Sequence, residues 1–124
     1  MRVLIAEDEK RTRAILVDMV RSLGCDVVEA ASGFEAVKRV KEDRPDVLLL
    51  DGLLPEMHGF EIARFVRSFA PDYRPRIVIV TAVYKARRYQ NEAKLQYGVD
   101  EYLVKPVTRE AVAAAIFGEK KIEN

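Results

Sequence analysis

Five short apolar runs are separated along the chain by longer segments with helical periodicity. The runs are Val3–Ala6, Val27–Ala30, Val47–Leu50, Ile77–Val80 and Tyr102–Val104. A continuous apolar run bounded by turn residues is typical of a strand that is buried on both faces, as in a parallel sheet. Strands that are joined through helices must lie parallel, and right-handed crossovers leave few topologies. The pattern predicts an α/β fold of (βα)5 type, with a doubly wound five-stranded parallel sheet in the order 2-1-3-4-5.

Local signals predict how the first two helices are oriented and where they begin or end. The first helix is expected to bury a stripe that includes Ile15 and Leu16. It should end at Gly24, because glycine suits the left-handed cap that closes many helices. The second helix is expected to open with a capping box in the segment SGFE, Ser32–Glu35.

The three later helices are predicted from similar signals. The third should stop before Pro71, because proline cannot continue the helical hydrogen-bond ladder. The fourth is expected within residues 84–98. Thr108 is expected to cap the start of the fifth helix with its hydroxyl oxygen.

Composition favours one compact domain. The chain has 124 residues, of which 49% are hydrophobic, and this suits a single core. We expect the domain to span residues 1–118 and residues 119–124 to form a tail. The formal charge of +1 gives no overall attraction to nucleic acid or to an anionic membrane, so neither is an expected partner. No segment approaches the roughly 20 apolar residues of a membrane span, and a cytoplasmic location is expected.

Acidic residues follow two strands that the predicted order makes neighbours. Glu7 and Asp8 follow the first strand, and Asp51 ends the third. The three carboxylates should therefore converge at the carboxyl edge of the sheet, where ligands bind in such folds. Crowded carboxylates repel one another unless a cation intervenes, and oxygen ligands suit Mg²⁺. The alternative for Glu7 and Asp8 is a structural role at the positive start of the first helix. Asp51 could also act as a nucleophile toward phosphorus.

Two more strand ends carry polar residues toward the same edge. The segment RIVIVTA ends its strand at Thr81, and YLVKP ends at Lys105. A phosphoryl group on Asp51 would need its oxygens neutralised, and a lysine, a hydroxyl and a metal ion could do this together. A threonine at a strand end is ordinarily a turn residue and a lysine there is ordinarily solvated. Their position in register on successive strands favours the functional interpretation.

Four segments together resemble the receiver domains of two-component response regulators, the CheY-like family, over essentially the whole chain. They are IAEDE, LLLDGLLPEMHGFE, VTA and GVDEYLVKPV, in that order. The resemblance implies a flavodoxin-like fold and a regulatory phosphoacceptor domain rather than an enzyme with a separate substrate. It implies that Asp51 accepts a phosphoryl group. Mg²⁺ is the implied cofactor, and the implied metal ligands are Glu7, Asp8, Asp51 and the Leu53 backbone carbonyl. Glu7 stands where many members have aspartate, so it is expected to reach the metal through water.

The same resemblance implies roles for three residues on the last two strands. It assigns Thr81 and Lys105 to the phosphoryl oxygens, and Thr81 and Tyr102 to the conformational switch. It also implies a cis bond between Lys105 and Pro106, an isomer that only a bond to proline makes accessible. The alternative for Tyr102 is a half-buried sheet tyrosine without a switching role.

Partners and signal lifetime are also implied by the resemblance. The phosphoryl donor would be a sensor histidine kinase or a phosphotransfer protein. A downstream protein or a fused output domain would contact the Val83–Ile116 region. Leu53 and Val83 occupy the positions that flank the path of the hydrolytic water. Both are apolar, so slow self-dephosphorylation is expected.

Three alternative interpretations are less consistent with these residues. A hydrolase of the haloacid dehalogenase type also uses a strand-end aspartate and Mg²⁺, but it needs a second acid where this chain has Leu53. A flavodoxin-like FMN carrier needs a phosphate-binding loop after the first strand, and that loop is acidic here. A scaffolding receiver that never accepts phosphate would not need Asp51, Thr81 and Lys105 together.

Overall fold

The protein forms a five-stranded parallel sheet in the order β2-β1-β3-β4-β5, which confirms the predicted topology. The computed structural model describes residues 1–82, 91, 92, 94 and 96–118. The strands are β1 (Arg2–Ala6), β2 (Asp26–Ala30), β3 (Val47–Asp51), β4 (Arg76–Thr81) and β5 (Glu101–Val104). Chain order reverses between β1 and β3, so the carboxyl ends of these neighbouring strands form the switch point of the sheet.

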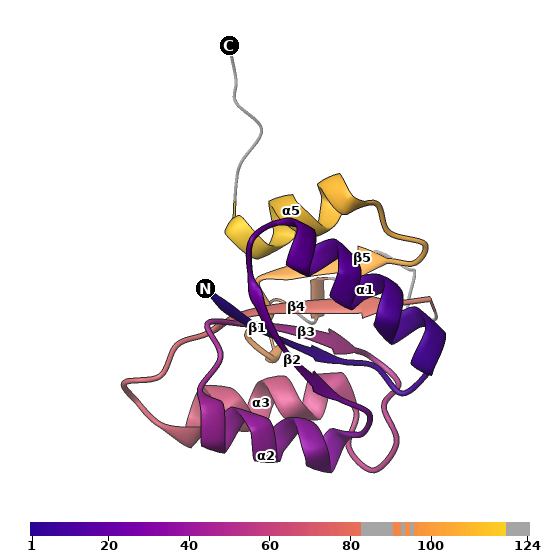
Figure 1. Cartoon of the computed structure of the whole chain (residues 1–124). Coiled ribbons are helices and arrows are strands. Elements are labelled where there is room, and N and C mark those ends of the chain that lie inside the picture. Colours follow the sequence, from indigo (N-terminus) through magenta and orange to yellow (C-terminus); the bar gives the residue numbers. More distant parts are fainter. Residues whose placement is uncertain (83–90, 93, 95, 119–124) are drawn as a thin grey trace.

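Helices cover both faces of the sheet. Those with assigned bounds are α1 (Lys10–Ser22), α2 (Gly33–Asp43), α3 (Gly59–Phe69) and α5 (Arg109–Phe117). Figure 1 shows α1 and α5 on one side and α2 and α3 on the other, and each pair is in contact. The fourth helix was predicted within 84–98, and most of that segment lies outside the described residues.

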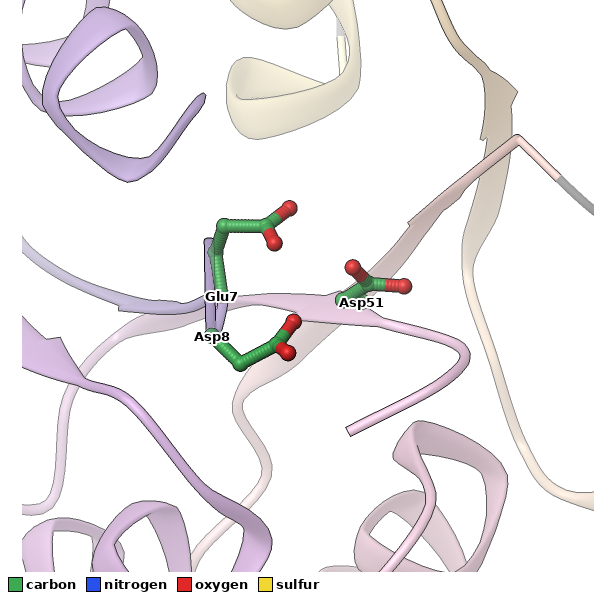
Figure 2. A group of neighbouring side chains, drawn as sticks. All are labelled: Glu7, Asp8 and Asp51. Carbon is green, nitrogen blue, oxygen red and sulfur yellow. The ribbon is translucent and has the colours of Figure 1, made fainter. Parts of the chain in front are cut away.

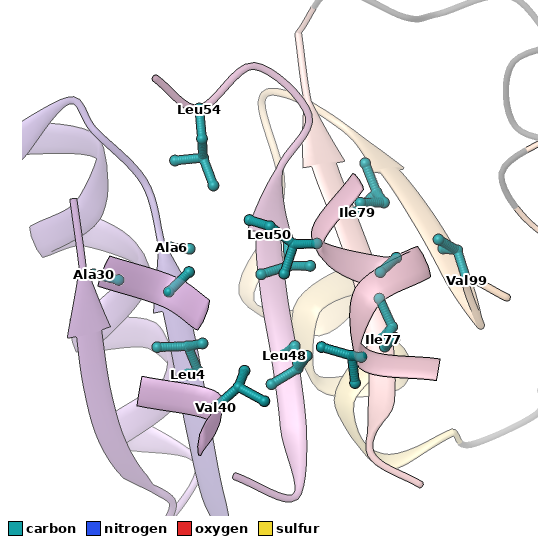
Figure 3. Close-up of a cluster of buried hydrophobic side chains, with 14 of the residues drawn as sticks. Leu4, Ala6, Ala30, Val40, Leu48, Leu50, Leu54, Ile77, Ile79 and Val99 are labelled. Atoms are coloured by element: carbon teal, nitrogen blue, oxygen red, sulfur yellow. The ribbon is translucent and has the colours of Figure 1, made fainter. Parts of the chain in front are cut away.

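Two hydrophobic clusters fill the space between the sheet and its helices. Leu4, Leu48 and Leu50 belong to the cluster beneath α2 and α3, part of which Figure 3 shows. Ile5 and Leu49 belong to the cluster beneath α1 and α5. Every residue of β3 is buried. Because burying one leucine or isoleucine side chain contributes about 1.5–3 kcal/mol, these layers hold the end of β3 rigidly in place.

The buried stripe of α1 differs from the predicted one. Leu16, Val17 and Val20 are its buried residues, whereas Ile15 is 51% exposed. The prediction for Ile15 was wrong because apolar spacing alone leaves the rotation of a helix uncertain by about one residue, or 100° at 3.6 residues per turn. The predicted end of the helix is confirmed, since Gly24 has a φ of +88° and follows the C-cap directly.

The predicted starts of α2 and α5 and the predicted end of α3 are confirmed, with one change in the cap of α2. The Ser32 hydroxyl accepts a hydrogen bond from Glu35 N at 3.2 Å. A capping box would return a bond from Ser32 N, but the Glu35 carboxylate instead accepts from Ala31 N at 2.6 Å. Thr108 caps α5, and α3 ends before Pro71 as predicted.

Two glycines let backbone segments approach closely around the loop that follows β3. Gly33 N donates to the Pro55 carbonyl oxygen at 2.9 Å, and a Cβ atom on Gly33 would overlap Met57. A Cβ atom on Gly59 would overlap the carbonyl oxygen of Asp51. The loop is therefore clamped between the starts of α2 and α3, and this fixes the backbone that carries Asp51.

Glu9 caps the start of α1, and this role makes the stability of the fold depend on pH. Its carboxylate accepts hydrogen bonds from Thr12 N at 2.8 Å, the Thr12 hydroxyl at 2.7 Å and Arg11 N at 3.1 Å. These bonds, chiefly those from Thr12, hold the pKa of Glu9 below its ordinary value of 4.5. A lowered folded-state pKa contributes stability above the unfolded-state pKa, and this contribution is lost as the pH falls through the folded-state value.

We therefore expect Glu9→Gln to lower the free energy of unfolding at neutral pH and to reduce the loss of stability on acidification. Urea unfolding curves across the acid range measure both effects. Glu42→Gln on the exposed surface of α2 controls for the change in net charge. A difference between Glu9→Gln and the parent that stays constant at every pH would contradict the expectation.

Candidate functional site

Three carboxylates meet at the carboxyl edge of the sheet, as the sequence predicts. One oxygen from each of Glu7, Asp8 and Asp51 lies within 4.8 Å of the others. Figure 2 shows them gathered where β1 and β3 end. Glu7 is 2% exposed and Asp51 is 9% exposed, while Asp8 is open to solvent. Two of the three negative charges are thus largely removed from water, which is costly without a positive partner.

Lys105 supplies a positive partner from the end of β5. Its Nζ donates to Glu7 Oε1 at 2.5 Å and to Asp51 Oδ2 at 3.2 Å. Its backbone N–H donates to the Thr81 carbonyl oxygen at 2.9 Å. The peptide bond between Lys105 and Pro106 is cis, which confirms the expectation from the resemblance. The lysine ammonium therefore bridges two of the acids, one from each strand at the switch point.

The pKa values of Glu7 and Lys105 are both raised, although their ion pair alone would lower that of Glu7. Burial raises the pKa of Glu7, the Asp51 charge adds to the rise, and the Lys105 ammonium opposes it. For Lys105, burial disfavours the charged form, but the hydrogen bonds and charges of Glu7 and Asp51 outweigh it and raise the pKa. Lys105 is therefore an ammonium throughout the neutral range, and its stabilising contribution is lost only as the pH rises through the raised value.

Glu7 and Asp51 each have one carboxylate oxygen that Lys105 does not contact, and a backbone N–H donates to each of these oxygens. Glu9 N donates to Glu7 Oε2 at 3.0 Å, and Leu53 N donates to Asp51 Oδ1 at 2.9 Å. Each of the four carboxylate oxygens thus accepts at least one bond. Charge-assisted bonds of this kind fix the orientation of a carboxylate as well as its charge.

Arg13 also helps to shape the site, and sequence reasoning did not identify it. Its Nη1 donates to the Glu7 carbonyl oxygen at 2.9 Å, and its Nε donates to Glu29 Oε1 at 3.2 Å. The guanidinium thus links α1 and β2 to the strand end that carries the acids. An arginine in the second turn of a helix is usually solvent-facing, so the sequence offered no signal for this contact.

Thr81 and Tyr102 lie on the last two strands, and both are buried. Thr81 is fully buried, and a Cβ atom built on Gly52 would be 3.3 Å from the Thr81 hydroxyl oxygen. The threonine side chain therefore lies beside the residue that follows Asp51. Tyr102 is 7% exposed and packs against Phe60 with ring centroids 6.3 Å apart, so its ring lies in the interior of the domain. Val83 lies outside the described residues.

Comparison with known proteins identifies the family. The family model for the response regulator receiver domain matches residues 3–117. The chain is 35% identical to the response regulator MprA of Mycobacterium leprae over 116 residues, which cover 94% of this chain and 49% of MprA. It is 22% identical to the protein PilG of Pseudomonas aeruginosa over 116 residues, covering 94% of this chain and 84% of PilG. The chain belongs to the response regulator receiver domain family and therefore to two-component signalling.

Solved structures agree with this assignment. The Vibrio cholerae chemotaxis protein CheY4 superposes with a TM-score of 0.84 at 26% identity, covering 94% of this chain and 96% of that one. The receiver domain of the sensor histidine kinase PA1611 from Pseudomonas aeruginosa superposes with a TM-score of 0.79 at 30% identity, covering 95% and 98%. That crystal structure has a magnesium ion coordinated in its active site cleft. The family match favours a receiver over the hydrolase and the flavin carrier.

In the part of the chain that the structure describes, no helix is both long enough and apolar enough to cross a bilayer. The chain spans about half the length of MprA.

Proposed function

We propose that Asp51 accepts a phosphoryl group in a Mg²⁺-dependent reaction and that phosphorylation changes which partner the domain binds. The observation that carries the proposal is the set of charges around Asp51. Its carboxylate ends a fully buried strand, lies with two further acids within 4.8 Å, and contacts the Lys105 ammonium at 3.2 Å. A carboxylate held beside a metal-binding set and a fixed cation is equipped for phosphoryl transfer.

The donor set fits magnesium. Mg²⁺ prefers oxygen ligands and keeps several of its waters, so one or two carboxylates are enough to hold it. Asp8 and Asp51 would bind the ion directly, and the Leu53 backbone carbonyl would be a further ligand. Glu7 would contribute through water, because it is the most deeply buried of the three acids. When bound, the ion would neutralise negative charge on the phosphoryl oxygens.

The transfer step requires no proton from the protein. With acetyl phosphate as donor, an Asp51 carboxylate oxygen forms a bond to phosphorus while the bond from phosphorus to the acetate oxygen breaks. Acetate leaves with the electron pair. Lys105 would donate hydrogen bonds to one phosphoryl oxygen and Thr81 to another, which stabilises charge that Asp51 alone would repel. A phosphohistidine on a sensor kinase or a phosphotransfer protein would donate in the same way, with the imidazole ring as the leaving group.

The output of the domain would be a protein contact. The Val83–Ile116 region is where a downstream protein or a fused output domain would bind, with Thr81 and Tyr102 linking it to the phosphoryl group. Phosphorylation would act by shifting an equilibrium between two conformations of the domain. It can shift that equilibrium only by the difference in its interaction free energy with the two conformations. We propose no nucleic-acid contact for this domain itself.

The direct test is intact-mass measurement after incubation with acetyl phosphate, with Mg²⁺ or with excess chelator. We expect the mass of one phosphoryl group to be gained with Mg²⁺ and to be almost absent with chelator. An unchanged mass under both conditions would refute the function. Phosphoryl uptake that is unchanged by the chelator would refute the metal requirement. Turnover of a small phosphate ester would favour the hydrolase of the haloacid dehalogenase type.

The lifetime of the phosphorylated state is expected to depend on Leu53. Its side chain is 39% exposed, and its backbone N–H donates to Asp51, so it stands beside the phosphorylation site. An apolar side chain cannot orient the attacking water, and orientation is a large part of phosphoryl-transfer catalysis. We expect Leu53→Asn to lose its phosphoryl group several-fold faster than the parent, as followed by intact mass after the donor is removed. Leu53→Met is the control of similar size, and equal decay in all three proteins would contradict the expectation.

A further inference from the structure

Glu7 is the most deeply buried of the three acids, and protein donors reach both of its side-chain oxygens. Its side chain is 2% exposed, Oε1 accepts from Lys105 Nζ at 2.5 Å, and Oε2 accepts from Glu9 N at 3.0 Å. Its main-chain carbonyl accepts from Arg13 at 2.9 Å. Asp8, by contrast, is exposed. Both the main chain and the side chain of Glu7 are therefore held in place. Protein donors already occupy the two side-chain oxygens that could otherwise bind a metal ion.

The Lys105 ammonium lies nearer to Glu7 than to Asp51. The two distances are 2.5 Å and 3.2 Å. A lysine has a flexible four-carbon stem and loses considerable rotamer entropy when it is held in one position, so its place depends on what it contacts. Lys105 also lines a cavity of about 400 Å³ whose lining is mainly apolar and includes Ile15 and Pro106. That lining offers the ammonium no counter-charge, so the position of the ammonium depends on the acids.

We propose that Glu7 is a positioning residue that holds the Lys105 ammonium beside Asp51, and that it affects phosphoryl transfer through Lys105 rather than as a direct metal ligand. The inference rests on the proposed phosphoacceptor function of Asp51. It explains why glutamate can occupy this position, because the longer side chain reaches across to the lysine while Asp8 and Asp51 remain for the ion. A positioning residue and a direct metal ligand predict different effects on the phosphorylation rate when residues 7 and 105 are substituted together.

A double-mutant cycle separates the two roles. Glu7→Gln keeps the size of the side chain, but it leaves a single oxygen to accept from both Glu9 N and Lys105. Lys105→Met keeps the stem and removes the charge. Initial rates of phosphoryl uptake from acetyl phosphate at saturating Mg²⁺ are measured for the parent, both single variants and the double variant. We expect Glu7→Gln to be about tenfold to a hundredfold slower, the usual cost of a misplaced catalytic group.

The double variant should then be no slower than Lys105→Met alone, because at saturating Mg²⁺ Glu7 would affect the rate only through Lys105. If the two losses multiply, Glu7 acts independently of the lysine and the inference is wrong. Glu42→Gln and Lys38→Met on the exposed surface of α2 form the matched control pair, and they should change neither rate.

Two readouts do not require phosphorylation. In the metal-free parent, nitrogen NMR should show a slowly exchanging Lys105 ammonium, which is assigned by its loss in Lys105→Met and should disappear in Glu7→Gln. Calorimetry should show that Glu7→Gln weakens Mg²⁺ binding less than Asp8→Asn does. A persistent ammonium signal in Glu7→Gln, or equal losses of Mg²⁺ affinity, would overturn the inference. If the parent takes up no phosphoryl group, the function of Asp51 fails, and these two readouts alone still decide the role of Glu7.

Discussion

An Asp51→Asn variant is expected to fold as the parent does and to take up no phosphoryl group from acetyl phosphate. The amide retains the size of the carboxylate and an oxygen that can accept from Leu53 N, so the end of β3 should keep its position. An amide is not a nucleophile toward phosphorus, and it also removes one of the three charges that would hold Mg²⁺. We expect the phosphorylation signal to be lost completely, and calorimetry should show weaker Mg²⁺ binding.

The matched control for this loss is Asp72→Asn. The Asp72 side chain is 79% exposed, and its partner Arg44 is 3.5 Å away on the surface, so the substitution changes net charge without touching the site. Its uptake should equal that of the parent. A phosphoryl mass gain in Asp51→Asn at the rate of the parent would place the acceptor elsewhere.

A Gly59→Ala variant is expected to be markedly less stable than the parent. The added Cβ would overlap the Asp51 carbonyl oxygen, a main-chain atom of the fully buried strand, so neither side can move easily. Overpacking at such a position should lower the free energy of unfolding by about 2–4 kcal/mol. The better helix propensity of alanine would offset less than about 1 kcal/mol of this.

Gly24→Ala is a comparison variant in which the added methyl group changes the backbone conformational energy but causes no steric overlap. Gly24 has a φ of +88°, and a Cβ atom there would meet nothing within 4 Å, so only the left-handed backbone is penalised. That penalty is about 1–2 kcal/mol. Urea unfolding of both variants gives the comparison, and a Gly59→Ala protein as stable as the parent would show that the loop after β3 is not clamped as described.

The sheet could be predicted from the sequence because its signals are local and repeated. A run such as Val47–Leu50 is too apolar for a surface strand, and helices between the runs require parallel pairing. The predicted strand order places Glu7 and Asp51 at the ends of neighbouring strands. The convergence of the acids follows from topology and needs no side-chain detail.

The details that sequence reasoning missed are long-range or depend on the phase of a helix. Ile15 was predicted inward and is 51% exposed, because neighbouring apolar residues in α1 allow more than one inward face. The contact between Arg13 and the Glu7 carbonyl joins a helix to a strand end, and no spacing in the sequence reports it. Nor could the sequence show that Lys105 would lie closer to Glu7 than to Asp51, since this depends on side-chain length at three separate strand ends.

The central claim is that Asp51 carries the phosphoryl group as an acyl phosphate, and chemical trapping tests it most directly. Borohydride reduces an acyl phosphate to an alcohol and so converts a phosphorylated aspartate to homoserine, which peptide mass spectrometry can locate. After incubation with acetyl phosphate and Mg²⁺, we expect homoserine at position 51 and at no other acidic position, and we expect none when chelator is present. Homoserine at Asp8 instead of Asp51, or a phosphorylated protein that yields none, would contradict the account.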